Sequence, residues 1–265
     1  MDRGGSQKRR HKSVANVDII SNLPDVIKDK ILCCLPIKEA VRTCFLSRKW
    51  RYTWASMTEL IFREDDFSLG NGNEDGETEN NIGELVASCP NLEKLVLSRL
   101  FSFADISIHS TKLKVLRVDG MFKHLNLVTP HVSSAVIDLQ VNTGYVPRAG
   151  CNFNLSEFIG SLLDIENISL LGHAFELMCR GYSVPSSTFW DSIDHQAGLF
   201  KNLDMVVMSN FTGSCAESSF LKLLLEDGPM LRTARIEDNN KLDKESLKQL
   251  LKMRRASKDA EVILL

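Results

Sequence analysis

The sequence predicts an α/β protein in which a small three-helix module precedes an irregular solenoid of parallel strands with helical returns and a C-terminal cap. Three observations predict this architecture. Residues 18–62 are dense in apolar and aromatic side chains, residues 63–82 are acidic and rich in glycine, and residues 83–265 repeat a leucine pattern. The chain has 265 residues and 43% apolar content, which is enough to bury a substantial core.

Charge and cysteine content narrow the classes of function. The chain carries 32 Lys and Arg against 34 Asp and Glu, so its net charge of −2 predicts no global attraction to nucleic acid. No apolar run is long enough to cross a bilayer, so no membrane partner is expected. The seven cysteines, with Cys33 and Cys34 adjacent, show no Cys-x-x-Cys spacing and predict neither a disulfide framework nor a metal site.

The N-terminal residues 1–17 are polar and basic, and we expect a disordered tail there. They lack the apolar stretch of a secretory signal. The cluster Lys8-Arg9-Arg10-His11-Lys12 leaves two interpretations open, a nuclear import signal or a charged tail.

The module of residues 18–62 is predicted to hold three short helices. Pro24 suits the first turn of a helix, and Ile27, Ile31 and Leu35 then recur at helical spacing on one face. The pair Leu35-Pro36 ends this helix and opens a second one. Ser47 is predicted to cap a third helix that carries Trp50 and Trp54. Helices this short need each other, and a partner, to bury their apolar side chains.

Residues 63–82 are predicted to form a solvated acidic linker. Seven acids and no Lys or Arg lie between Glu64 and Asn81, together with several glycines. Repelling charges and glycines bury too little surface to offset the entropy of ordering the chain. Their spacing does not fit an EF-hand.

Residues 83–265 repeat the pattern Leu-x-x-Leu-x-Leu. We expect a first position at Leu92, Leu113, Val136, Ile165, Leu203 and Leu231. The spacings between them are 21, 23, 29, 38 and 28, and four of these five fall in the range of about 20–29 residues typical of leucine-rich repeats. An insertion between Gly172 and Gly198 would explain the long interval.

Each repeat predicts a short strand followed by a return, and neighbouring repeats must stack to cover one another. Some returns have helical spacing. They are the segments containing Phe158, Ile159, Leu162 and Leu163, then Phe220, Leu223 and Leu224, then Leu247, Leu250 and Leu251. A final strand is expected at residues 261–265. An ordinary α/β domain remains the alternative for this region.

The string from Ile20 to Arg51 resembles an F-box. The matching signature positions are Leu23-Pro24, Leu35-Pro36, Ala40-Val41 and Leu46-Ser47-x-x-Trp50-Arg51. The whole chain looks like a plant F-box/leucine-rich-repeat protein of the FBD-containing group. We therefore expect degenerate leucine-rich repeats over residues 83–200 and FBD-like C-terminal repeats over residues 201–265.

Two further segments carry the second resemblance. Cys89-Pro90-Asn-Leu92-Glu-x-Leu95-x-Leu97 resembles a unit that recurs in this group. Phe220-Leu-Lys-Leu-Leu-Leu, Gly228-Pro-x-Leu231 and Arg254-Arg-Ala-Ser-x-x-Ala-Glu-Val262 resemble its C-terminal FBD segment. The chain departs from the group in having fewer repeats between the two regions.

The resemblance implies a non-catalytic substrate receptor of a Skp–cullin–F-box ubiquitin ligase, located in the nucleus or the cytoplasm. The F-box would dock on a Skp-type adaptor, which a cullin carrying a RING protein holds, while the repeats hold an unknown target. The expected adaptor-binding residues are Leu23, Pro24, Ile27, Ile31, Leu35, Pro36, Val41, Leu46 and Trp50, with Trp50 the strongest anchor because aromatic residues dominate such contacts. Any of these residues can equally belong to the core of the module.

The target is expected on the strand face of the repeats, with Glu93, Lys94, Lys114 and Arg117 as candidate contacts. No catalytic residue and no cofactor is predicted, because the sequence contains no nucleophile elbow, P-loop or dinucleotide fingerprint. Two alternatives stay open: an adaptor-binding scaffold or decoy without a ubiquitination target, and an enzyme hidden in the repeat region.

Overall fold

The computed structural model of the protein describes residues 18–66, 82–100, 105–120, 124–138, 158, 160–171, 200–238, 242 and 244–265. Several sequence predictions lie outside these residues. They concern the basic tail of residues 1–17, residues 67–81 of the linker, Ile159, the insertion between Gly172 and Gly198, and Leu139 and Val141 of the third repeat.

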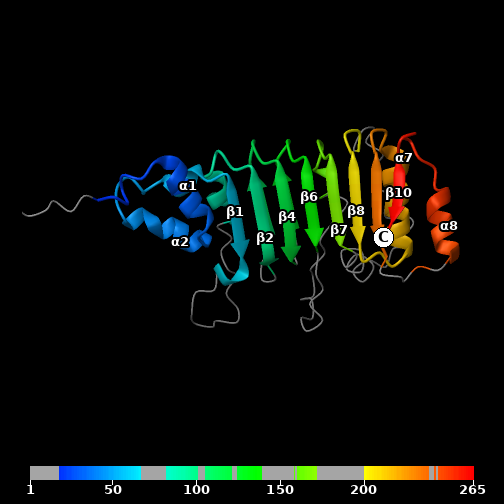
Figure 1. The fold of residues 1–265 in the computed structure, drawn as a ribbon, viewed down its shortest axis with the longest axis horizontal. Helices are drawn as coiled ribbons and strands as arrows, with labels where there is room; N and C mark the ends of the chain where they lie inside the picture. The colour runs from blue at the N-terminus through cyan, green and yellow to red at the C-terminus, as the bar shows by residue number, and fades with distance from the viewer. Residues whose placement is uncertain are drawn as a thin grey trace, which may run out of the picture.

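One parallel sheet organises the molecule, as Figure 1 shows. Its strands lie side by side in the order in which they occur along the chain. They are β1 (Glu59–Arg63), β2 (Lys94–Leu100), β4 (Val115–Gly120), β6 (Ser134–Asp138), β7 (Asn167–Leu171), β8 (Met205–Ser209), β9 (Thr233–Glu237) and β10 (Glu261–Leu264). The predicted mixture of helices and parallel strands is confirmed.

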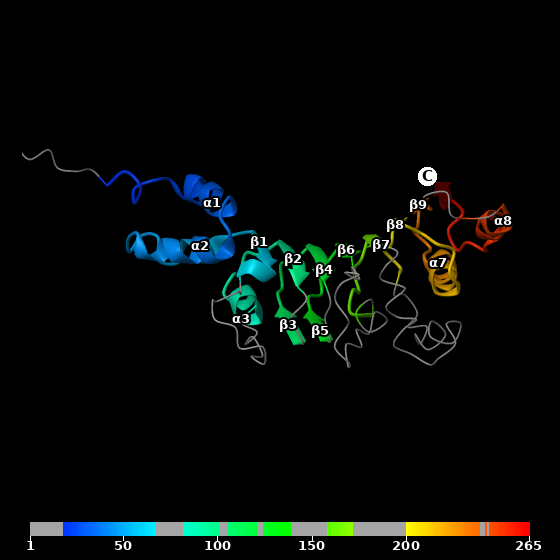
Figure 2. The same ribbon diagram turned by 90° about the horizontal axis from the view of Figure 1, so that it is seen from below.

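The returns lie behind this sheet. Figure 2 shows the sheet edge-on as an arc, with α3 (Ile82–Ala87), α7 (Cys215–Asp227) and the second sheet on its outer side. That second sheet pairs β3 (Asp105–His109) with β5 (His124–Val128) in parallel. The helical returns expected around Phe220 and Leu250 are confirmed as α7 and α8 (Lys244–Lys252).

Six strands of the main sheet begin with the same hydrogen-bond pattern. Lys114 and Val115 both donate their backbone N–H groups to the carbonyl of Glu93 at 2.9 Å. Ser133 and Ser134 donate in the same way to Lys114, at 2.9 and 3.0 Å. The same doubled bond recurs at the entries of β2, β7, β8 and β9. Each unit is therefore positioned by the unit before it.

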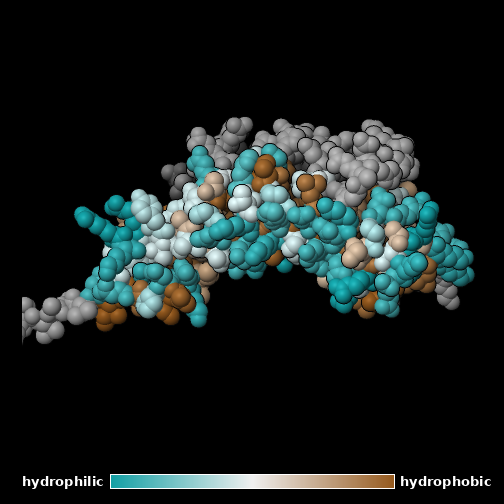
Figure 3. All heavy atoms as spheres, turned by 90° about the horizontal axis from the view of Figure 1, so that it is seen from above, coloured by the Kyte–Doolittle hydropathy of each residue, from teal (hydrophilic) through white to brown (hydrophobic). Residues whose placement is uncertain are grey.

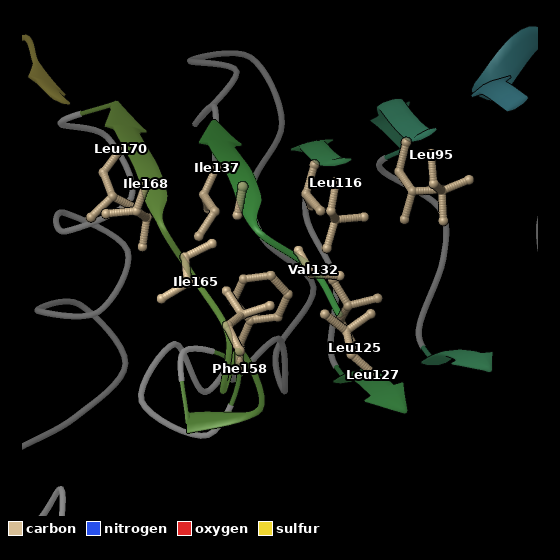
Figure 4. Packing of buried hydrophobic residues seen from close by; sticks show 14 of the residues in the cluster. Leu95, Leu116, Leu125, Leu127, Val132, Ile137, Phe158, Ile165, Ile168 and Leu170 are labelled. Carbon is tan, nitrogen blue, oxygen red and sulfur yellow. The ribbon is translucent and has the colours of Figure 1, made fainter. Parts of the chain in front are cut away.

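The inward side chains of the strands form continuous apolar rows. The inner row in the first half of β2 to β9 is Leu95, Leu116, Ala135, Ile168, Val206 and Ala234, all almost fully buried. Figure 4 shows how side chains from these strands meet Leu125 and Leu127 of the second sheet and Phe158. One buried cluster extends from Leu32 to Leu250.

The predicted register of the third repeat is wrong. The expected first position, Val136, lies on the outward face of β6, and the buried positions are Val132, Ala135 and Ile137. The pairing of Leu116 with Ala135 confirms the shift, because both side chains enter the same inner row. The true intervals around this repeat are 19 and 33 residues, counted from Leu113 to Val132 and from Val132 to Ile165.

The N-terminal module contains α1 (Asp25–Cys33), α2 (Ile37–Arg42) and the short 3₁₀ turns η1 (Thr43–Phe45) and η2 (Thr53–Ser56). The predicted third α-helix is wrong. The hydroxyl of Ser47, its expected cap, is buried and makes no hydrogen bond. The backbone instead makes successive three-residue turns, such as Trp50 N–H to the Ser47 carbonyl at 3.0 Å.

The module and the sheet share one core. Residues 59–62, predicted at the end of the module, and Arg63, predicted to begin the linker, together form β1 and pair with β2 over five residues. Leu60 and Phe62 of this strand have no exposed surface. Helix α2 contacts β1, so the module continues directly into the first strand. Beyond β1, η3 (Glu64–Asp66) opens the acidic segment.

Candidate functional site

Helix α1 leaves several of its apolar side chains exposed. It begins after Pro24, whose φ of −57° and ψ of 147° place it at the N-cap. The side chains that face inward are Lys28 and Leu32, four residues apart. Ile27 and Ile31 are 41% and 39% exposed, so the apolar stripe predicted from their spacing faces solvent and not the module.

The inner side of α1 carries a buried lysine, which is unusual for a side chain of this type. Lys28 is 6% exposed, and its ammonium group lies 3.1 Å from a carboxylate oxygen of the exposed Asp25. A helix packed only for its own module would place the isoleucines inward and the lysine outward. The outward position of Ile27 and Ile31 therefore indicates that α1 has a second surface to cover.

The segment after α2 adds two large exposed side chains. Ile37 and Ala40 of α2 are buried, and Val41 is half-buried against the same core. The hydroxyl of Thr43 donates to the Ala40 carbonyl at 2.6 Å and tightens the chain into η1. This turn leaves Phe45 86% exposed and Leu46 58% exposed.

Trp50 lies in the core of the module. It is 1% exposed, and its indole N–H donates to the carbonyl of Ile20 at 3.2 Å. Beside it, the ammonium group of Lys49 donates to the side chain of Asn22 at 2.6 Å. The burial of Trp50 revises its expected role as the main anchor, because in this conformation it has no surface to offer.

These two bonds hold the turn that precedes α1. Ser21 N–H donates to the Asp18 carboxylate at 2.9 Å, and the hydrogen bonds from Ser21 hold the pKa of Asp18 below its usual value. The turn presents Ile19, 71% exposed, and Ile20, 56% exposed. Trp50 thus contributes to the surface by fixing Ile20.

The nine predicted residues separate into three groups by burial. Pro24, Ile27, Ile31, Pro36 and Leu46 are exposed, whereas Leu23, Leu35 and Val41 are half-buried and pack on the core. Trp50 is buried. The sequence reasoning did not include the exposed Ile19, Ile20, Val26, Phe45 and Tyr52. The run Cys44-Phe45-Leu46 was an available signal, because three successive apolar residues cannot share one helix face.

Exposed apolar side chains concentrate in this module, and we call them the apolar surface. Of the thirteen large hydrophobic side chains exposed in the described part of the chain, eight lie between Ile19 and Tyr52. They are Ile19, Ile20, Val26, Ile27, Ile31, Phe45, Leu46 and Tyr52. Figure 3 shows apolar side chains gathered at this end of the molecule. Such a concentration is typical of an interaction surface.

The outward face of the sheet is a second, charged surface. Lys94 forms an ion pair with Glu59 at 2.7 Å, and Lys114 forms one with Glu93 at 3.2 Å. The expected contact residues Glu93, Lys94, Lys114 and Arg117 are all exposed. Two acids of the same face are instead buried. Asp119 and Asp138 are paired in register on β4 and β6 and are 8% and 3% exposed.

The pKa of Asp119 lies above its usual value. Burial raises the pKa of Asp119, and the nearby Asp138 raises it further. A hydrogen bond of 3.2 Å from the Ser98 hydroxyl and the charge of Arg117 act in the opposite direction. The second carboxylate oxygen of Asp119 is buried without a hydrogen-bond partner.

The residues that the structure describes contain no cluster of metal-ligand side chains. Among them, no group of three His, Cys, Asp or Glu side chains could hold a metal ion. The five described cysteines are free thiols. Burial raises the pKa of Cys89 to about 11, so this thiol stays protonated and is a poor nucleophile. None of the described helices has the length and apolar character needed to span a bilayer.

Comparison with known proteins gives the apolar surface its identity. The model of the F-box domain matches residues 20–62. F-box/FBD/LRR-repeat protein At1g13570 of Arabidopsis thaliana is 48% identical over 54 residues, which are 20% of this chain and 13% of that protein. F-box/LRR-repeat protein At3g59200 from the same plant is 42% identical over 69 residues, 26% of this chain and 13% of that protein.

A third relative, the Arabidopsis thaliana putative F-box/FBD/LRR-repeat protein At3g49480, is 47% identical over 47 residues, 18% of this chain and 10% of its own length. The matches to these three relatives thus span only 10% to 13% of each relative. Residues 20–62, which carry the apolar surface, are an F-box domain, and the chain is similar in this region to F-box/LRR-repeat and F-box/FBD/LRR-repeat proteins of Arabidopsis thaliana.

Proposed function

We propose that this protein is the substrate-recognition subunit of a Skp–cullin–F-box ubiquitin ligase. The observation that carries the proposal is the outward apolar stripe of α1 together with Phe45 and Leu46, which lies within the F-box domain. F-box domains generally bind Skp-type adaptors. An adaptor would cover these side chains and gain about 25 cal/mol for each Å² of apolar area that it removes from water.

The F-box docks on the adaptor through exposed residues and not through the whole predicted set. Ile27, Ile31 and Leu46 contribute surface directly, whereas Leu23, Leu35 and Val41 position the segments that carry it. Trp50 belongs to the second class, because it holds Ile20 through its indole N–H. Phe45 replaces it as the strongest candidate anchor, since an aromatic ring that is 86% exposed gains most from being covered.

The region after the F-box is a degenerate leucine-rich-repeat solenoid that ends in an FBD-like cap. Three features support this assignment: the strands are parallel and follow chain order, the entries of six strands of the main sheet repeat the same doubled hydrogen bond, and the inner apolar rows are continuous. The FBD-like segment of residues 201–265 would comprise β8, α7, β9, α8 and β10. In this assignment the repeats hold the target while the adaptor, cullin and RING protein bring the ubiquitin-conjugating enzyme close to it. The chain itself does no bond chemistry and acts through proximity.

Helix α7 shows how this cap is held together. Ser214 caps the helix, and Glu217 completes a capping box. The carboxylate of Glu217 is 1% exposed and accepts from Thr212 N–H at 3.0 Å, the Thr212 hydroxyl at 2.7 Å and Ser214 N–H at 2.9 Å. These bonds join the loop after β8 to the helix that covers the sheet.

The test is capture of a Skp-type adaptor by purified full-length protein. Ile31→Lys and Phe45→Ala should each weaken capture strongly, and Phe45→Ala should leave the melting temperature unchanged because its ring is 86% exposed. Leu251→Lys is the matched control, since Leu251 is exposed to 50% on α8, outside the F-box. Equal capture by wild type and both F-box variants would contradict the docking assignment. Ubiquitination of a bound protein would then separate a receptor from a scaffold without a target.

A further inference from the structure

The outward face of the sheet contains one unbroken row of eight paired residues, which we call the central row. It consists of Ile61, Val96, Arg117, Val136, Ser169, Val207, Arg235 and Ile263. Every neighbour in the row is a register partner on the adjacent strand. These residues alternate along the strands with the buried inner rows, so they lie on the face of the sheet opposite α3 and α7. Figure 2 shows this face of the sheet as the inner side of the arc.

The composition of the central row differs from that of its flanks. Its aliphatic members are half-exposed, and its only charged members are Arg117 and Arg235, both exposed. On the strand-entry side of the row, Lys94 forms an ion pair with Glu59 and Arg232 forms one with Asp204. Arg117 and Arg235 form no ion pair with any other residue that the structure describes. The row is therefore an aliphatic strip between two available guanidinium groups.

The spacing of these two arginines sets the length of a matching ligand. They are four strands apart in the sheet, and neighbouring strands lie about 4.8 Å apart, so their backbones are separated by about 19 Å. An extended peptide advances about 3.3 Å per residue, so two side chains six residues apart are separated by about 20 Å and point to the same side. The two residues between them on that side would meet Val136, Ser169 and Val207.

We propose that the central row binds an extended peptide segment that carries two carboxylates six residues apart and aliphatic side chains between them. The guanidinium groups of Arg117 and Arg235 would each hold one carboxylate, a pairing whose planar geometry favours arginine over lysine. The inference rests on the proposed function in one respect: it names the class of target that the repeats would hold.

Acidic side chains lie beside the row at both of its arginines. Asp119 and Asp138, in the next row along β4 and β6, are buried, and Asp119 lies close to Arg117. Glu237 lies two residues beyond Arg235 on β9, where it is half-exposed, and the exposed Glu261 pairs with Thr233, two residues before Arg235. A ligand carboxylate therefore competes with an acidic neighbour at each end of the row.

The test is fluorescence anisotropy with full-length protein and a labelled heptapeptide. The probe has glutamate at its first and seventh positions, valine at the third and fifth, and serine elsewhere. Arg117→Glu and Arg235→Glu should each weaken its binding by about fivefold, and the double variant by more than tenfold, as expected for exposed ion pairs. Arg254→Glu, a matched change of an exposed arginine outside the row, should leave binding unchanged.

Charge exchange makes the test decisive. A peptide with lysine in place of both glutamates should bind the double variant more tightly than it binds wild type. A peptide of the same composition with adjacent glutamates should bind wild type at least fivefold more weakly than the probe. Equal binding of the two glutamate peptides, or no binding at millimolar concentration, overturns the inference. Adaptor capture by the same protein is measured separately. If the adaptor is captured but the peptide does not bind, the peptide assignment fails and the proposed function does not.

Discussion

Trp50 and Phe45 are expected to have opposite roles, and exchanging each for alanine tests this directly. Trp50 is 1% exposed and donates a hydrogen bond to Ile20, so Trp50→Ala leaves a large cavity. Such a truncation costs about 3–5 kcal/mol of unfolding free energy. Phe45 is 86% exposed, so Phe45→Ala should change the same quantity by less than about 0.5 kcal/mol.

Adaptor affinity should fall directly in Phe45→Ala, because the ring itself would be covered, and only indirectly in variants of Trp50. Burying a whole phenylalanine side chain contributes about 1.5–3 kcal/mol, and most of this is still available at Phe45. Phe45→Ala should therefore weaken docking by up to about 2.5 kcal/mol, roughly sixtyfold. Trp50→Phe keeps the aromatic ring but deletes the N–H donor, so it should lower stability by about 1 kcal/mol and loosen the turn at Ile20.

Stability is measured by urea denaturation monitored by circular dichroism, and affinity is measured by titration with the adaptor. If Trp50→Ala unfolds within about 1 kcal/mol of wild type and yet loses the adaptor, Trp50 is an interface residue and the argument from burial is wrong. A large loss of stability in Phe45→Ala would equally refute the reasoning, because it would mean that the ring is covered within the chain.

Three further substitutions probe the sheet and the cap. Burial raises the pKa of Asp119 in the folded state, so the free energy of unfolding should fall as the pH rises from about 4 through that pKa. Asp119→Asn should flatten this pH dependence in urea titrations, and it should stabilise the protein at neutral pH. Gly120→Ala places a Cβ 2.4 Å from the Leu100 carbonyl oxygen at a φ of +149°, and should cost about 2 kcal/mol or more in denaturation experiments. Glu217→Ala removes an acceptor of three hydrogen bonds and should lower the melting temperature clearly, whereas the exposed Glu226→Ala should not.

Local signals in the sequence predicted several elements correctly. The pairs Leu23-Pro24 and Leu35-Pro36 placed the starts of α1 and α2, because proline restricts the backbone of its own residue and of the one before it. The apolar spacing around Phe220 predicted α7, and five of the six leucine patterns fell on buried strand positions.

Signals that depend on distant neighbours failed. The third helix was expected from Ser47, but a good capping residue does not form a cap when its hydroxyl faces the core. In the third repeat, the segments beginning at Val132 and at Val136 both fit the pattern Leu-x-x-Leu-x-Leu. Only the pairing of Leu116 on the neighbouring strand with Ala135 decides which of the two registers is buried.

The sequence by itself determined that the chain has an F-box-like helical module followed by parallel strands, because proline positions and apolar periodicity act over a few residues. The tertiary structure alone decided which side of α1 faces solvent, that Trp50 is buried, and that Arg117 and Arg235 share one row. These facts depend on contacts between segments far apart in the chain. Spacing shows which side chains share a face of a helix or strand, but only packing shows whether that face is covered.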